Sequence, residues 1–464
     1  MNRSGLAVGV LTVALAASLV SRQPAQDARL SGALREPVRN GWTAVHLKGS
    51  PAQVGFQHGY LLAPEIQDAV RVVAAGFEHD TKRGWKFYRD AARETFWPHV
   101  EAEYRQEIEG IAAGLAARGV KLDVWDVTAL NAMTEFVPYY IAWADRSGPQ
   151  PPRPERCSAF VATGSYTKDG RPVIAHNAWT GYMEGQRWSI VFDIQPARGH
   201  RILMDGYPGL IHSGDDFGMN DAGILITETT ISQFRGGFDP KGVPEFVRAR
   251  KAMQYAESID DFARLMTEGN NGGYANNWLI ADRNTGEIAS LELGFKNVNL
   301  RRTKDGYFAG SNFPVNEQLI KEETNFDPKD LSTSPSARRV RWEQLMAEHK
   351  GRIDLGLAQR FLSDHYDSFA KKEDPNERTL CGHIDLSPRG SGEWQPPYGA
   401  AGAVQSKAAT AGMAERMTMA ASMGHSCGIN FNAAGHLEKH PQFAWQKPFL
   451  RDLPSQSWTE FTVR

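Results

Sequence analysis

The sequence predicts an α+β protein in which antiparallel sheet is covered by helices. Three observations support this. The first third of the chain has helical periodicity, the middle holds many short strands separated by turns, and helices mixed with loops return toward the end. The chain has 464 residues, of which 41% are hydrophobic, so it can bury a large core. It contains no internal repeat and no low-complexity tract.

The N-terminus has the layout of a secretory signal peptide. Arg3 supplies a positive charge, residues 6–20 are almost all apolar or small, and the chain turns polar from Ser21. The apolar run is short for a membrane span, so an uncleaved anchor is the weaker alternative. We therefore expect residues 1–22 to be removed and the protein to be exported, either to the periplasm or out of the cell, with no stable membrane span.

Residues 23–156 are expected to form a helical N-terminal segment of a precursor. Ser50, followed by proline and then by Gln53, is a typical helix start. A second helical stretch is predicted from about Lys82 to Arg118, and Gly119 suits its end.

The sequence pattern changes from helical to strand-like after a proline-rich loop at 148–154, which cannot lie inside a helix or sheet. The remainder, residues 157–464, is expected to be the catalytic portion. Its predicted strands are 158–164, 172–179, 188–194, 201–205, 223–230, 277–282 and 288–293. Its predicted helices are 247–256, 259–267, 337–349 and 355–363.

Cys157 directly follows the proline-rich loop and directly precedes the first of these strands. If the bond between Arg156 and Cys157 were cut, the thiol would lie beside its own α-amine. A free α-amine has a pKa of roughly 7.7–8.0 and can act as a base near neutral pH. One residue would then supply both nucleophile and base. The alternative is a buried, inert cysteine.

Several motifs in a fixed order resemble the phospholipase B-like family of N-terminal-nucleophile cysteine hydrolases. They are Cys157-Ser158-Ala159-Phe160, His176-Asn177-Ala178-Trp179-Thr180, Tyr207-Pro208-Gly209, Asp215-Asp216-Phe217, Thr227-Glu228-Thr229-Thr230, Tyr274-Ala275-Asn276-Asn277-Trp278, His440-Pro441-Gln442-Phe443 and Trp445-Gln446-Lys447-Pro448. The resemblance runs from about Gly49 to the end. The N-terminal third also resembles penicillin-acyltransferase-like and choloylglycine-type hydrolases, through residues 55–59 and 109–112.

This resemblance implies a four-layer αββα fold, autocatalytic cleavage between Arg156 and Cys157, and Cys157 as the nucleophile. It also implies removal of acyl chains from phospholipids, whereas the amidase relatives cleave amides such as bile salts and penicillins. Those amidases have arginine and aspartate around the second strand of the first hairpin. This chain has His176 and Trp179 there, as phospholipase B-like proteins do.

Further catalytic candidates follow along the chain. His176 could orient the nucleophile or protonate a leaving group, or it could be a structural histidine. Asn276 or Asn277 could donate an amide N–H to an oxyanion, although asparagine also favours such turn positions. Asp215 and Asp216 could fix the cysteine amine, and a loop or capping role is the alternative.

Arg338 or Arg339 opens a predicted helix in a context where relatives carry a site arginine, and we take Arg339 as the candidate. Trp179, Tyr207 and Thr229 are taken as substrate-binding residues. Trp179 could wall an acyl pocket or could belong to the core.

The remaining cysteines and two further motifs allow other interpretations of the sequence. Cys381 and Cys427 could form a disulfide, which would leave Cys157 as the odd cysteine. Residues 424–428 match the G-x-S-x-G elbow, but residues 414–423 before it look helical, and no suitable acid and histidine follow. His365 and the pair Cys381 and His383 could ligate a metal, but isolated pairs rarely do, so no metal and no cofactor are predicted.

The sequence therefore predicts a self-processed cysteine hydrolase that cleaves acyl esters of lipids, with its two fragments remaining associated. An N-acyl amide hydrolase or acyltransferase and an inactive lipid-binding relative are the alternatives. The expected partner is a small acyl substrate. The formal net charge of −2 provides no electrostatic basis for binding nucleic acid.

Overall fold

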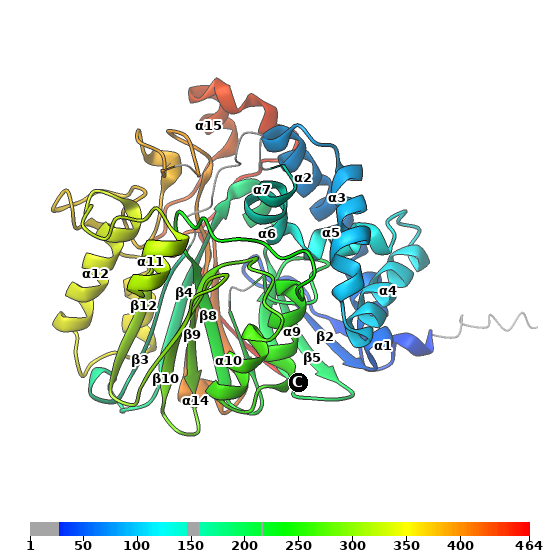
Figure 1. The fold of residues 1–464 in the computed structure, drawn as a ribbon, viewed down its shortest axis with the longest axis horizontal. Helices are drawn as coiled ribbons and strands as arrows, with labels where there is room; N and C mark the ends of the chain where they lie inside the picture. Colours follow the sequence, from blue (N-terminus) through cyan, green and yellow to red (C-terminus); the bar gives the residue numbers. More distant parts are fainter. Residues whose placement is uncertain (1–26, 146–156, 215–216, 393) are drawn as a thin grey trace, which may run out of the picture.

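The computed structural model describes residues 27–145, 157–214, 217–392 and 394–464, and it arranges them in four layers. Two β-sheets pack face to face, and helices cover the outer face of each sheet (Figure 1). The expected αββα architecture is therefore confirmed. No helix in these ranges is long and apolar enough to cross a bilayer.

The first sheet has nine strands within the described ranges. In order across the sheet these are β1 (Leu34–Arg35), β2 (Thr43–Gly49), β5 (Ile190–Pro196), β6 (Ile202–Gly206), β7 (Phe217–Asn220), β8 (Ile224–Thr230), β9 (Asn276–Asp282), β10 (Ile288–Leu293) and β11 (Val298–Thr303). Neighbouring strands are antiparallel except β2 and β5, which run parallel.

The second sheet has six strands in the described part of the chain, and all of its pairs are antiparallel. Its order is β12 (Gly306–Gly310), β3 (Ser158–Thr163), β4 (Val173–Gly181), β15 (Ala401–Thr410), β16 (Thr418–Met423) and β17 (Thr459–Thr462). A separate two-stranded ribbon joins β13 (Tyr366–Asp367) to β14 (Lys372–Glu373).

Helices form the two outer layers. The nine-stranded sheet packs on α1 (Pro51–Leu61), α4 (Ala102–Ala117), α9 (Glu245–Tyr255) and α10 (Ile259–Thr267), and the six-stranded sheet packs on α12 (Ser334–Glu348) and α13 (Leu355–Leu362). The other α-helices are α2 (Ala63–Thr81), α3 (Trp85–Ala91), α5 (Val124–Asn131), α6 (Met133–Glu135), α7 (Ile141–Ala144), α8 (Tyr182–Gly185), α11 (Glu317–Glu323), α14 (Ala411–Ala414) and α15 (Ala433–Lys439). Short 3₁₀ turns are η1 (Ala28–Leu30), η3 (Trp97–His99), η5 (Gly164–Tyr166), η6 (Ile384–Leu386) and η7 (Pro441–Gln446), and π turns are η2 (Ala92–Phe96) and η4 (Phe136–Tyr140).

Strand β3 shows why the middle strands are apolar on both faces. Successive side chains of a strand point to opposite faces. Phe160 and Ala162 accordingly pack in the core against α12 and α13, whereas Ala159 and Val161 pack in the core between the two sheets. A strand that is covered on both sides needs no polar face, so its sequence reads as a continuous apolar run.

The predicted start of α1 is confirmed. Ser50 Oγ accepts a hydrogen bond from the Gln53 backbone N–H at 3.4 Å, and Gln53 Oε1 accepts one from the Ser50 backbone N–H at 3.0 Å. Each side chain thus satisfies a backbone donor that the first turn of a helix leaves without a partner.

Two expectations about the elements are wrong, and one strand of the first third was not expected. The helix predicted over 82–118 is interrupted between η3 and α4, because Pro98 cannot continue a regular helix. The mainly helical first third also contains β2, which lies inside the nine-stranded sheet. Residues 414–423, expected to be helical, contain strand β16, which pairs with β15 and β17.

Candidate active site

Cys157 lies directly before β3, the second strand of the six-stranded sheet. It is buried, and its φ of 80° lies in the left-handed region that residues other than glycine rarely adopt. Cys157 lines a small hollow together with Ala178, Trp179, Thr180, Trp188, Gly214, Glu228 and Tyr274. The hollow is therefore lined by residues at β3 and β4 of the six-stranded sheet and by residues in or near the nine-stranded sheet.

Arg338 of α12 holds the backbone of this cysteine. Its Nη1 donates to the Cys157 carbonyl oxygen at 2.5 Å and to Ser158 Oγ at 3.1 Å. The guanidinium stacks over the indole of Trp179, with 4.2 Å between Cζ and the ring centroid. The planar, permanently charged guanidinium can make these contacts at the same time, which an ammonium group cannot.

The same guanidinium connects the two sheets. Arg338 Nη2 donates to Asn312 Oδ1 at 2.8 Å, and Asn312 Nδ2 donates to the Thr230 carbonyl oxygen at 2.8 Å. The start of β3 is thereby linked to the end of β8 on the opposite sheet. Backbone and side chains at this edge are held in one hydrogen-bonded network.

The choice of Arg339 as the site arginine is wrong in geometry. The hydrogen bond to the Cys157 carbonyl comes from Arg338, whereas Arg339 Nη2 donates to the Pro328 carbonyl oxygen at 3.4 Å. Adjacent residues on a helix project about 100° apart, because the helix has 3.6 residues per turn. Only Arg338 therefore faces the sheet.

His176 lies on β4, opposite Ala159 of β3 and Lys407 of β15. It is fully buried, and its ring approaches the backbone of Glu228 on the opposite sheet. Burial, and then the positive charge of Lys407, hold the pKa of His176 well below its usual range. A neutral imidazole is a poor proton donor, so this geometry does not favour protonation of a leaving group by His176.

A buried ion pair beside His176 bridges the sheets and was missed by sequence reasoning. Lys407 Nζ on β15 lies 3.1 Å from Asp205 Oδ2 on β6, and both side chains are fully buried. Gln405 Nε2 donates to the same carboxylate oxygen at 3.0 Å. The available signal was a lysine in an otherwise apolar strand, because a buried charge requires a partner.

The two asparagines of β9 point to opposite faces of the sheet. Asn277 alternates with Leu279 and Ala281, which pack in the core between the sheets, whereas Asn276 alternates with Trp278 and faces the helices. The Oδ1 of Asn277 accepts a hydrogen bond from Ser290 Oγ at 2.7 Å. Its Nδ2, and both polar side-chain atoms of Asn276, are buried without a partner in the described ranges.

The three predicted substrate-binding residues lie in different surroundings. Trp179 lines the hollow at Cys157. Tyr207 is fully buried and packs on Trp188, with 5.4 Å between ring centroids, and it does not line the hollow. Thr229 is buried against Gly310 of β12, where an added Cβ would come within 2.4 Å of its Oγ1. Arg156, Asp215 and Asp216 lie outside the described residues.

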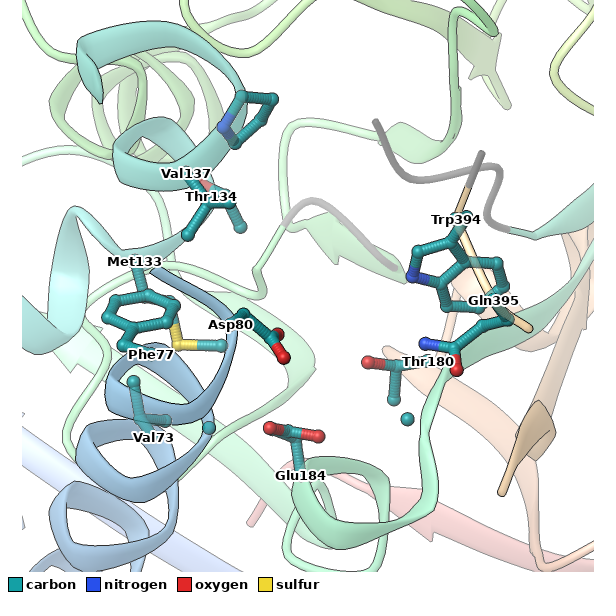
Figure 2. Close-up of a pocket in the computed structure, with 13 residues that line it drawn as sticks. Val73, Phe77, Asp80, Met133, Thr134, Val137, Thr180, Glu184, Trp394 and Gln395 are labelled. Carbon is teal, nitrogen blue, oxygen red and sulfur yellow. The ribbon is translucent and has the colours of Figure 1, made fainter. Parts of the chain in front are cut away.

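A wider cleft adjoins the hollow through Thr180, which lines both. Figure 2 shows an apolar wall formed by Val73, Phe77, Met133 and Val137 on one side, with Trp394 and Gln395 across from it. The carboxylates of Asp80 and Glu184 point into the space between (Figure 2). The cleft has a volume of about 130 Å³ and is open to solvent, so it could hold part of an apolar chain whose remainder extends outward.

The disulfide between Cys381 and Cys427 is not formed, and both are free thiols. Each sulfur contacts Nε2 of His383, at 3.6 Å and 3.5 Å respectively. The elbow at 424–428 follows a strand after all, but Ser426 Oγ donates to the Leu362 carbonyl oxygen at 3.0 Å, a backbone group that cannot serve as its base.

Comparisons with known proteins place this geometry in a family context. The model of the phospholipase B family matches residues 71–327, more than half of the chain. An uncharacterised protein of Archaeoglobus fulgidus is 28% identical over 52% of this chain and 42% of its own length. Human phospholipase B-like 1 is 21% identical over 72% of this chain and 68% of its own length, and the bovine protein is 22% identical over 54% and 49%.

The chain thus spans about half the length of the archaeal and bovine relatives. Among solved structures, penicillin V acylase from Agrobacterium tumefaciens aligns with 57% of this chain and 83% of its own at a TM-score of 0.35 and 10% identity.

Proposed function

This chain belongs to the phospholipase B family, and from that premise we propose that it is a cysteine hydrolase that releases acyl groups from lipid esters. The single observation that carries the proposal is the setting of Cys157. Cys157 lies directly before β3 of the six-stranded sheet, and its carbonyl is held by a buried guanidinium. It lines a hollow that adjoins an apolar cleft.

The first step is self-cleavage. The Cys157 thiolate attacks the carbonyl carbon of Arg156, the C–N bond breaks, and the acyl group moves to sulfur as a thioester. The nitrogen of Cys157 takes up the proton lost by the thiol and becomes the free α-amine as the C–N bond breaks. Water then hydrolyses the thioester to the Arg156 carboxylate and the free thiol. The left-handed backbone of Cys157, a conformation that costs roughly 1–3 kcal/mol, favours this step because cleavage removes the constraint on φ.

In the processed protein the new amine accepts the thiol proton, and the thiolate attacks the ester carbonyl of the substrate. The alcohol leaves with that proton, and water, activated by the same amine, releases the fatty acid. We assign Asn277 as the oxyanion donor because its side chain faces the opposite sheet. Ser290 holds the Oδ1 of this amide, so its Nδ2 has no partner in the described residues and can donate to an oxyanion. His176 and Arg338 act as positioning residues.

The cleft supports a lipid ester as the substrate. An acyl chain can lie along Phe77 and Met133, where its burial contributes about 0.8 kcal/mol per methylene. Asp80 and Glu184 would then lie near the polar end of the substrate, where they favour a cationic group over an anionic one. We further propose that residues 1–22 direct export to the periplasm or the medium.

The test is release of free fatty acid from phosphatidylcholine in mixed micelles, run beside hydrolysis of an N-acyl amide such as penicillin V. Wild type should release fatty acid, Cys157→Ala should not, and Arg339→Lys should match wild type. Hydrolysis of the amide alone would contradict the ester assignment. No turnover of either substrate by processed wild type would favour a binding protein over an enzyme.

A further inference from the structure

A second group of reactive side chains lies apart from Cys157, where three loops converge. His365 follows α13, Cys381 and His383 precede η6, and Cys427 follows β16. The ligand atoms of these four side chains all lie within 4.8 Å of one another. They come from segments up to 62 residues apart in the sequence, which is why isolated motifs did not indicate a site.

The distances match the edges of a metal tetrahedron. His365 Nε2 lies 3.2 Å from His383 Nε2, and the sulfurs of Cys381 and Cys427 lie 3.6 Å and 3.5 Å from His383 Nε2. Zinc bonds sulfur at about 2.3 Å and nitrogen at about 2.0–2.1 Å, so a tetrahedral site separates sulfur from nitrogen by about 3.6 Å and nitrogen from nitrogen by about 3.4 Å.

Hydrogen bonding alone does not explain the convergence. An imidazole nitrogen makes one hydrogen bond in the ring plane, yet His383 Nε2 contacts three potential ligand atoms. A cation at the centre would accept a lone pair from each of the four groups. His383 and Cys381 are fully buried, whereas His365 and Cys427 are partly exposed, which provides a route for an ion to enter.

The surrounding groups suit an outer shell rather than ligation. Asp385 Oδ1 accepts from the Tyr182 hydroxyl at 2.7 Å and lies 3.8 Å from His383 Nδ1. His425 Nε2 is 2.9 Å from the same hydroxyl, and its ring stacks on His383 at 4.2 Å. At 3.8 Å the Asp385 carboxylate makes no hydrogen bond to His383, but it lies next to Nδ1, the ring nitrogen that does not face the two sulfurs.

We propose that His365, Cys381, His383 and Cys427 bind one Zn²⁺ in a closed, structural Cys₂His₂ site. Binding displaces the two thiol protons, so both cysteines coordinate as thiolates and both histidines as neutral imidazoles. The ion joins the three loops behind the hollow. Gly382 lies directly against the indole of Trp179, where an added Cβ would come within 2.1 Å of Cζ2, so the site supports the wall next to Cys157.

The test measures zinc by mass spectrometry in the full chain, purified without a histidine tag and dialysed extensively. Wild type should retain about one zinc per chain, and Cys427→Ser should lose most of it. Cys157→Ser and His440→Ala remove a cysteine and a histidine outside the cluster, and both should retain zinc as wild type does.

A second measurement needs no ligand variant. In folded Cys157→Ser protein, a mercurial reagent should release zinc to a chelating dye as two thiols react. Replacement by Co²⁺ should produce the intense visible absorption of a tetrahedral thiolate site. The proposal would be overturned if wild type contained no zinc and its mass were lower by two hydrogens, with Cys381 and Cys427 joined in a disulfide. Equal zinc contents in wild type and Cys427→Ser would also overturn it.

Discussion

The guanidinium of Arg338 connects Cys157 to both sheets. It contacts the Cys157 carbonyl, the Ser158 hydroxyl and the Asn312 amide, and it covers the Trp179 ring. Nη1 donates to both Cys157 and Ser158, Nη2 donates to Asn312, and the face of the same planar group covers Trp179. The position of the Cys157 backbone therefore depends on a side chain that comes from the outer helical layer, far away in the sequence.

Arg338→Lys should slow both self-cleavage and turnover. Lysine keeps the charge but cannot reach Cys157 and Asn312 together, and hydrogen bonds to charged groups contribute about 1.5–3 kcal/mol, which corresponds to a loss of about tenfold or more in rate. The fall should appear in kcat with KM little changed, because the contact acts on the nucleophile and not on the substrate.

Arg339→Lys is the matched control, since Arg339 has only a weak contact with Pro328. If Arg338→Lys were processed and turned over at the rate of Arg339→Lys, Arg338 would have no role in positioning Cys157.

Sequence reasoning selected Cys157 as the proposed nucleophile because this residue has a recognisable local setting, a proline-rich loop followed by a strand. It chose Arg339, whereas the contacts with Cys157 come from Arg338, because the choice depends on which face α12 turns to the sheet. The choice between Asn276 and Asn277 likewise depends on which face of the sheet each side chain occupies. Strand alternation separates the two asparagines only once the sheets are in place.

Helices α1 and α4 cross at very close range, and glycines make this possible. An added Cβ on Gly55 would come within 1.9 Å of the Glu107 carbonyl oxygen, and one on Gly59 within 2.0 Å of the Ile111 carbonyl oxygen. Gly114 is equally tight against Phe56. The obstructing atoms are backbone, which cannot rotate aside as a side chain can. This crossing accounts physically for the glycines at 55–59 and 110–114.

Gly55→Ala should therefore destabilise the protein by about 1–3 kcal/mol or more, because the two helices must separate to admit the methyl group. The measurement is the urea midpoint of the full chain. Gly356→Ala in α13 is the control, since its Cβ would meet nothing closer than 3.5 Å and alanine favours a helix. Equal midpoints for the two variants would contradict the close crossing.

Elements with a clear local pattern could be predicted. Residues 259–267 and 288–293 form α10 and β10 as expected, because each carries the periodicity of its structure and ends at a turn. Strand β2 was missed because its neighbours in the sequence are helical and its pairing partner, β5, lies more than 140 residues later. Strand β16 was missed because its alanines and methionines also favour a helix.

Across the whole molecule, the proposed cleavage would divide one sheet between two fragments. Strand β2 belongs to the segment before Cys157, yet it lies between β1 and β5 and pairs with β5 in parallel from Thr43 to Gly49. Helices α1 and α4 of the same segment cover that sheet. Fragments that share a sheet and a core should stay together after the chain is cut.

The most direct test is intact mass and N-terminal sequencing of purified wild type and Cys157→Ala, with a native mass for each. Wild type should yield a fragment that begins at Cys157, and its native mass should equal the sum of both fragments, while Cys157→Ala should stay one chain. If wild type remains a single chain at neutral and mildly acidic pH, Cys157 does not become an N-terminal nucleophile and the proposed mechanism is wrong.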